Sequence, residues 1–330
     1  MPNLRRRLIA GIVFGFLVIL ALALLADVRQ VGNRLASFSW GLLPLILACT
    51  LFNYVLRFIK WHYYLKLIGA RGLVWTESAR LFVAGFPLAV TPGKVGEALK
   101  AVWVNRKTEV PVARAVPVVV AERLSDGLAV LLLSTAGVIA YPTYWPAFAV
   151  VLTLLVGAVI LSQIRPLALA LLSLAERLAV IRRVAHHLRS FYEGTYALFR
   201  PRAVLVAVTL GTISWLGEGV GMYWVLRGLG VPGGWDRLAL AVFVLSFSTV
   251  VGAVSALPGG LGAAEASIAG MLSLLMALPV ETAAAATLLI RFCTLWFGVT
   301  LGLIVWAFSR DLLTPAAQPT DPLDTQALPG

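Results

Sequence analysis

The chain has 330 residues, of which 60% are hydrophobic and only 13% charged, and its formal net charge is +12. Soluble domains average about 45–50% apolar and about 25% charged residues. This composition, with a mean hydropathy of +0.91, indicates an integral membrane protein and excludes a disordered chain, a coiled coil and a secreted disulfide scaffold. We expect neither a disulfide nor a metal site, because Cys49 and Cys293 both lie in apolar stretches.

The basic residues lie between apolar stretches, where they would contact anionic lipid headgroups. The chain carries no fold signature of a nucleic-acid reader, so nucleic acid is not an expected partner. Gly-x-Ser-x-Gly, Walker and metal-spaced histidine motifs do not occur. We therefore expect neither enzymatic activity nor a cofactor.

Apolar stretches follow one another along most of the chain. The first, residues 8–26, has nineteen residues without a charge, which is enough to cross a hydrocarbon core of about 30 Å. The core of a signal peptide is about 7–15 residues, so we interpret this segment as a retained first helix. The others lie at residues 41–59, 81–104, 115–140, 144–162, 203–226, 238–256, 265–280 and 282–308. They do not alternate as barrel strands do, so they predict an all-α, polytopic helical membrane protein.

Basic residues gather on one predicted side of the membrane if residues 81–104 enter and leave from the same face. By the positive-inside rule this side and both termini are cytoplasmic, which places the protein in the cytoplasmic (inner) membrane. In this interpretation Arg57 and Lys60 are charges that follow the second apolar stretch, and Trp61 is an interfacial anchor.

The sequence predicts a single transmembrane domain over residues 1–312. Its basic segment, residues 165–202, is expected to be a plain cytoplasmic connector whose charges set the topology. An interfacial amphipathic helix on anionic lipid is the alternative. Residues 313–330 contain four prolines and are expected to be a disordered tail.

A related unit occurs twice, in repeat one at about residues 41–140 and in repeat two at about residues 203–308. Each contains Pro-Gly-x-x-Gly in an apolar hairpin, beginning at Pro92 and at Pro258. Each places an arginine 31 or 33 residues beyond that proline, Arg123 and Arg291. The helices that lead into the two units run in opposite directions in the predicted topology. We therefore expect inverted repeats with broken or re-entrant helices, between which a substrate binds.

The two breaks suit an anionic ligand. Proline removes a backbone donor, and glycine permits unusual dihedrals and close approach. A helix that restarts after such a break presents free N–H groups and a positive dipole end. The alternative is that the breaks are only kinks that shape packing. The candidate substrate-binding residues here are Thr91, Pro92, Gly93, Lys94, Gly96, Glu97, Pro258, Gly259, Gly260, Gly262 and Glu265.

Seven ionisable residues are flanked by apolar sequence: Glu97, Glu122, Arg123, Asp126, Glu218, Glu265 and Arg291. An unpaired charge at the bilayer centre costs about 2.5–3.5 kcal/mol on insertion scales. We therefore expect these groups to face one another or a watery cavity, with Glu97 and Glu265 as partners for the two arginines. We add Glu122, Arg123, Asp126 and Arg291 to the candidate site. A salt-bridge lattice that only fixes the bundle is the alternative, and Glu218 is isolated enough for protonation to be conceivable.

Five motifs together resemble one known family. They are Arg57-Phe-Ile-Lys-Trp61, Thr91-Pro-Gly-Lys-Val-Gly-Glu97, Glu122-Arg-Leu-Ser-Asp126, Leu257-Pro-Gly-Gly-Leu-Gly-Ala-Ala-Glu265 and Arg291. Over about residues 5–310 the chain resembles the flippase-like membrane region of lysylphosphatidylglycerol synthases. In full-length synthases this region is associated with moving aminoacylated phosphatidylglycerol between leaflets, and a separate domain makes that lipid. The chain ends about twenty residues past its last apolar stretch, so we expect a stand-alone member without the synthase domain. The resemblance links such stand-alone relatives with other lipids, including hopanoids and polyprenyl-linked carriers.

We therefore expect a flippase-like protein that moves or binds an anionic lipid, either an anionic phospholipid or a polyprenyl phosphate. A small-solute or ion-coupled secondary transporter would have the same sequence plan. A non-transporting scaffold for envelope lipid assembly is the third hypothesis. A second copy of the chain or an envelope enzyme is a conceivable protein partner.

Overall fold

The computed structural model describes residues 2–91, 96–166 and 179–313, together with residues 168, 170 and 173. These residues form helices joined by short turns, and no strand occurs among them. The long helices are α1 (Pro2–Leu25), α3 (Leu43–Leu67), α6 (Val112–Ala140), α7 (Trp145–Gln163), α9 (Ala179–Leu198), α10 (Pro201–Gly228) and α11 (Trp235–Val254). The shorter helices are α2 (Val28–Ala36), α4 (Trp75–Ala84), α5 (Leu99–Thr108), α12 (Ala263–Met276), α13 (Val280–Arg291), α14 (Phe297–Phe308) and α15 (Arg310–Leu313).

Six described helical segments are long and apolar enough to cross a membrane: Trp40–Leu67, Pro142–Gln163, Pro201–Gly228, Trp235–Val254, Pro258–Met276 and Val280–Phe308. Several begin with proline in the first turn, where its missing N–H has no helical partner to lose. The last segment joins α13 to α14 through a single π turn, Phe292–Trp296. The prediction of a polytopic helical membrane protein is confirmed.

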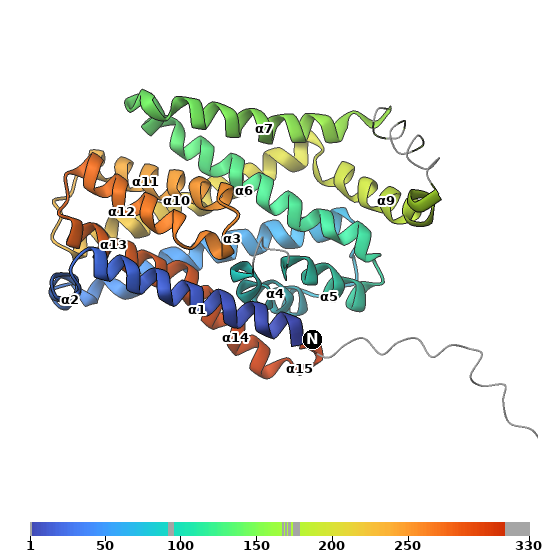
Figure 1. The fold of residues 1–330 in the computed structure, drawn as a ribbon. Helices are drawn as coiled ribbons and strands as arrows, with labels where there is room; N and C mark the ends of the chain where they lie inside the picture. The colour runs from blue at the N-terminus through green and yellow to red at the C-terminus, as the bar shows by residue number, and fades with distance from the viewer. Residues whose placement is uncertain are drawn as a thin grey trace, which may run out of the picture.

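Two hairpins enter the bundle from opposite ends (Figure 1). One is made of α4, the 3-10 turn Phe86–Val90 and α5, and it lies in the half that holds the N-terminus. The other is made of α11, the 3-10 turn Pro258–Gly260 and α12, and it begins at the end where α2 lies. The two 3-10 turns touch: a Cβ on Gly259 would lie 3.4 Å from a methyl group of Val90. Broken helices therefore meet inside the bundle, while their relation as inverted repeats stays a prediction.

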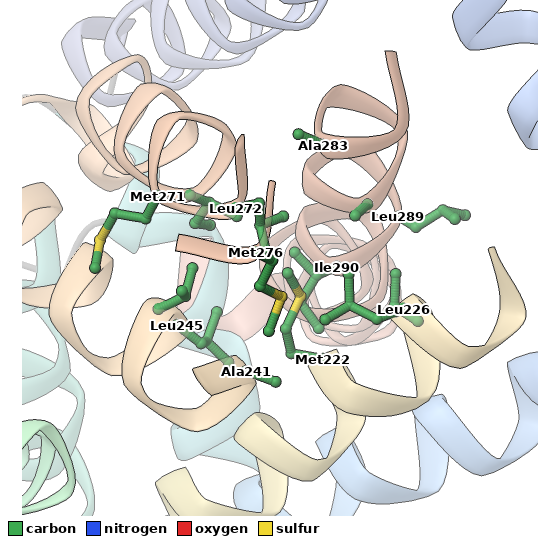
Figure 2. Close-up of a cluster of buried hydrophobic side chains, with 14 of the residues drawn as sticks. Met222, Leu226, Ala241, Leu245, Met271, Leu272, Met276, Ala283, Leu289 and Ile290 are labelled. Carbon is green, nitrogen blue, oxygen red and sulfur yellow. The ribbon is translucent and has the colours of Figure 1, made fainter. Parts of the chain in front are cut away.

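Small and flexible side chains pack the half of the bundle around the second hairpin. Met222 of α10 and Met276 of α12 converge at its centre, beside Ile290 of α13 (Figure 2). At Gly219 an added Cβ would lie 2.7 Å from the side chain of Val242. Lipid provides no hydrophobic drive for helices to associate, so this packing depends on close approach of their backbones.

The basic connector contains a packed helix. Gly194 of α9 lies so close to the start of α6 that an added Cβ would be 2.6 Å from the carbonyl oxygen of Arg114. Residues 179–198 of the predicted connector therefore form a helix that packs against α6.

The first residue of the predicted tail, Leu313, is the last residue of α15, and the carbonyl of the neighbouring Leu312 accepts a 3.0 Å hydrogen bond from Trp103. The rest of the predicted tail, residues 314–330, lies outside the described residues.

Candidate functional site

A cavity of about 430 Å³ lies where the two hairpin tips approach α6 and α10. Part of its wall is apolar, with Val151 and Leu155 from α7 and Leu245 from α11. Its charged lining comes from five helices and the first break: Arg57, Glu97, Lys100, Arg123, Asp126, Glu218 and Arg291; the second break adds Gly259 and Gly260. The cavity thus combines charged and apolar surfaces, as a binding site for an amphiphile requires.

At the first break the chain is held by Thr91. Its hydroxyl donates to the carbonyl of Leu88 at 2.6 Å and accepts from the N–H of Gly96 at 3.0 Å. Glu97 follows, 2% exposed, and its Oε2 lies 3.2 Å from Nε of Arg123. The predicted pairing of these two residues is confirmed. Pro92, Gly93 and Lys94 lie outside the described residues.

At the second break three glycines have positive φ, at Gly259 (61°), Gly260 (68°) and Gly262 (88°). Glu265 accepts the N–H of Gly262 at 2.6 Å and forms an ion pair with Nε of Arg291 at 2.5 Å. A second arginine nitrogen donates to the carbonyl of Gly259 at 3.0 Å.

The predicted partnership of Glu265 and Arg291 is therefore confirmed. The expectation of free N–H groups is wrong for Gly262, because the carboxylate from the first turn of the same helix already occupies that amide.

Two lysine–carboxylate pairs complete the charged lattice. Lys60 is fully buried in α3 and lies 2.5 Å from Asp126, with the Ser125 hydroxyl at 3.1 Å. Lys100 of α5 lies 2.6 Å from Glu122. These pairs satisfy the requirement that buried charges face one another.

The sequence interpretation of the α3 residues was wrong. Arg57 and Lys60 belong to a helix that continues to Leu67, and Arg57 lies 3.6 Å from Asp126. Trp61 is buried under the ammonium group of Lys100, 4.3 Å from its ring centre, and is not an interfacial anchor. Lys100 is absent from the predicted site residues, although its position inside the apolar stretch 81–104 is a sequence signal for a buried cation.

Glu218 stands apart from this lattice. It lies on α10, is 5% exposed and lines the cavity. Among the described residues its carboxylate has no side-chain hydrogen bond and no cation within 4.0 Å. Arg57 shares the same wall, beside the ring of Trp215, and its Nε has no hydrogen-bond partner there. Glu218 and Arg57 thus contribute a carboxylate and a guanidinium to the cavity wall that form no ion pair closer than 3.6 Å with the described residues.

The structure separates the predicted site residues into two groups. Those that line the cavity are Glu97, Arg123, Asp126, Gly259, Gly260 and Arg291. Those that lie behind them and shape the breaks or hold a partner are Thr91, Gly96, Glu122, Pro258, Gly262 and Glu265.

Residues 8–302 match the lysylphosphatidylglycerol synthase TM region, a family of membrane segments. The chain belongs to this family. The resemblance seen in the five motifs is thereby confirmed, and the cavity residues all fall within the family region.

A relative in the same size range is the UPF0104 membrane protein of Methanothermobacter thermautotrophicus, 30% identical over 113 residues. The match covers 34% of this chain and 32% of that protein. This partial match supports the assignment of the chain as a membrane protein, and it gives no information about substrate or partners.

Proposed function

We propose that this member of the family is a flippase-like protein of the cytoplasmic membrane, with both termini in the cytoplasm, that binds an anionic lipid headgroup and moves it between leaflets. The observation that carries the proposal is the mixed lining of the cavity, in which charged groups beside the two hairpin breaks, Glu97 and Arg291 among them, share the wall with apolar residues. A phospholipid or polyprenyl phosphate has the same division into a charged and an apolar part.

The charged end suits a phosphate group. Arginine presents planar donors that match phosphate oxygens, and it stays protonated in proteins. The side chains of Arg123 and Arg291 are 35% and 15% exposed despite their carboxylate partners, and both line the cavity. Arg57 adds a third guanidinium that is held only loosely. Carboxylates in the same lining offer contacts for a cationic group on the headgroup.

The apolar end suits acyl or prenyl chains. Val151 and Leu155 come from α7, which lies along one edge of the bundle (Figure 1). Only 6% of the apolar window in the Pro142–Gln163 segment is buried, so most of this helix faces outward. A lipid tail would leave the cavity past α7 while the headgroup stays between the hairpins.

The experiment is lipid movement in proteoliposomes that contain labelled anionic phospholipid or labelled polyprenyl phosphate. Wild-type protein should move at least one of them faster than empty vesicles. Arg123→Gln with Arg291→Gln should abolish the movement, and Arg71→Gln with Arg202→Gln, which also removes two charges but from exposed positions, is the matched control. Movement no faster than in empty vesicles for every anionic lipid contradicts the proposal. Faster uptake of a soluble glycerol phosphate than of any lipid would favour the solute transporter instead.

A further inference from the structure

A second polar pocket of about 350 Å³ lies away from the central cavity and shares no lining residue with it. It is formed where the start of α6, the end of α7, one face of α9 and the link to α10 come together. Its lining residues are Arg114, Arg165, Arg189, Tyr192, Glu193, Tyr196, Ala197 and Arg200. Four arginines against one glutamate leave the lining with a formal charge of +3.

Specific contacts hold the lining residues of this pocket in place. The five lining residues on α9 recur at helical spacing, so they occupy one face of that helix. The guanidinium groups of Arg165 and Arg200 lie 5.5 and 5.6 Å from the ring centre of Tyr196, in cation–π geometry. Gln163 also donates to the carbonyl of Tyr196 at 3.4 Å, which ties α7 to α9.

Three of the four arginines have no counterion among the residues that the structure describes. Among the described residues, Arg114, Arg165 and Arg200 form no ion pair, and Glu193 is paired with none of them. The Nε of Arg114 and the hydroxyl of Tyr192 are buried without a hydrogen-bond partner in the described chain. Like charges that converge on a cavity repel one another unless an anion joins them, and arginine forks match phosphate oxygens best.

The position of the pocket indicates where the anion comes from. Arg165 lies two residues after the membrane-crossing segment Pro142–Gln163, and Arg200 lies one residue before the segment Pro201–Gly228. One membrane-crossing segment ends beside the pocket and the next begins there, which places the pocket at the depth of the lipid headgroups. We propose that this pocket binds the phosphate of an anionic membrane lipid at the bilayer surface, independently of the lipid movement proposed for the central cavity.

The test is a calorimetric titration of the full-length protein in a nonionic detergent with dihexanoyl phosphatidic acid. Dihexanoyl phosphatidylcholine, inorganic phosphate and pyrophosphate form the comparison arms. Arg165→Gln with Arg200→Gln should weaken phosphatidic acid binding by about tenfold or more, the effect of losing charge-assisted hydrogen bonds. The matched control, Arg71→Gln with Arg202→Gln, removes the same charge from exposed positions outside the pocket and should change it less than about twofold.

The lysine pair Arg165→Lys with Arg200→Lys keeps the charge but loses the planar fork, so we expect a smaller loss of affinity. In a background of Glu265→Gln with Arg291→Gln, which weakens only the central cavity, the glutamine pair should cause the same loss of phosphatidic acid binding, which separates the pocket from the central cavity. Equal affinity of the glutamine pair and the control pair overturns the proposal. Equal affinity for phosphatidylcholine also overturns it. Pyrophosphate or inorganic phosphate bound as tightly as the lipid would overturn the lipid source and assign the site to a soluble phosphate.

Discussion

Arg291 and Glu265 lie on different helices, and their ion pair closes the second hairpin break. Nε of the arginine is 2.5 Å from the carboxylate, and another of its nitrogens donates to the carbonyl of Gly259. The same carboxylate accepts the amide of Gly262, the residue that directly precedes α12. One pair therefore holds the tip of the hairpin and the start of the next helix, and its arginine lines the cavity.

This pair allows a double-mutant test that separates structure from binding. Arg291→Gln should lower stability by about 3–5 kcal/mol, because it strands a buried carboxylate. Glu265→Gln combined with Arg291→Gln should recover most of that loss, since glutamine still accepts the Gly262 amide through its oxygen. If the arginine also holds the headgroup, the double variant folds but moves no lipid. Thermal unfolding and lipid movement measured on the three variants decide this, and a stable, fully active Arg291→Gln protein contradicts both roles.

Much of this fold could be predicted from apolar run length and from the two Pro-Gly motifs. The stretches 144–162 and 203–226 match α7 and α10 within a few residues. The stretch 41–59 ends eight residues before α3 does, because Lys60 interrupts the apolar run. That lysine stays in the helix only because Asp126 of α6 meets it. The length of an apolar stretch carries no information about a charged partner on another helix.

The part of the site that could be predicted from the sequence is the pairing of buried arginines with carboxylates. Buried arginines need carboxylates, and the repeated order of features supplied Glu97 and Glu265 as the partners. Nothing in the sequence pairs Lys100 with Glu122, because that pair depends on how α5 packs against α6. The pocket beside α9 depends in the same way on three helix ends that are distant in the sequence.

Two buried glutamates should respond oppositely to neutralisation. Glu122→Gln strands Lys100, which is 4% exposed, so we expect a stability loss of about 3–5 kcal/mol. Glu218→Gln strands no cation within 4.0 Å among the described residues, so the melting temperature should stay unchanged or rise. Removing this charge should also strengthen binding of an anionic headgroup in the cavity. Thermal unfolding in detergent measures the difference, and a lower melting temperature for Glu218→Gln than for Glu122→Gln would refute it.

The short helix α15 should be held less tightly against α4 in acid. A hydrogen bond from Arg80, 2.8 Å from Asp311, lowers the pKa of that carboxyl below its usual value. The stabilisation is therefore present above the usual carboxyl pKa of about 4 and is lost as the pH falls through the lowered value. Because the pair is partly exposed, it contributes only about 0–1 kcal/mol.

Hydrogen exchange of residues 310–313 should be unchanged between about pH 5 and 8, after correction for intrinsic rates, and faster below about pH 4. Asp311→Asn should reproduce the fast exchange at neutral pH. Asp236→Asn, which changes an exposed aspartate at the opposite end, is the control. Equal protection of α15 in wild type and Asp311→Asn would argue against the ion pair as its anchor.

The topology is accessible to reporter fusions. We expect residue 180 and the C-terminus in the cytoplasm, with residues 143 and 232 outside, because α7 and α10 each cross the bundle between these points. Phosphatase and fluorescent-protein fusions at these positions give opposite readouts on the two sides. If residues 143 and 180 proved to be on the same side, the inverted relation of the two hairpins would be lost.

The hairpin tip should tolerate no side chain at Gly260. Its φ is +68°, and an added Cβ would lie 3.0 Å from the Cα of Gly252 on α11. Gly260→Ala should therefore cost about 1–2 kcal/mol for the left-handed conformation alone, and more for the backbone contact. Since this turn lies at the cavity wall, lipid movement should fall with it.

Gly270 provides the matched control, because it lies within α12 and an added Cβ there meets no atom within 4 Å. Gly270→Ala should stabilise the helix by about 0.5–1 kcal/mol and leave lipid movement intact. Thermal unfolding and proteoliposome assays on both alanine variants make the comparison. Equal stability of the two would mean that the tip relaxes freely, and a mobile tip could not hold Arg291 and Glu265 in the geometry on which headgroup binding depends.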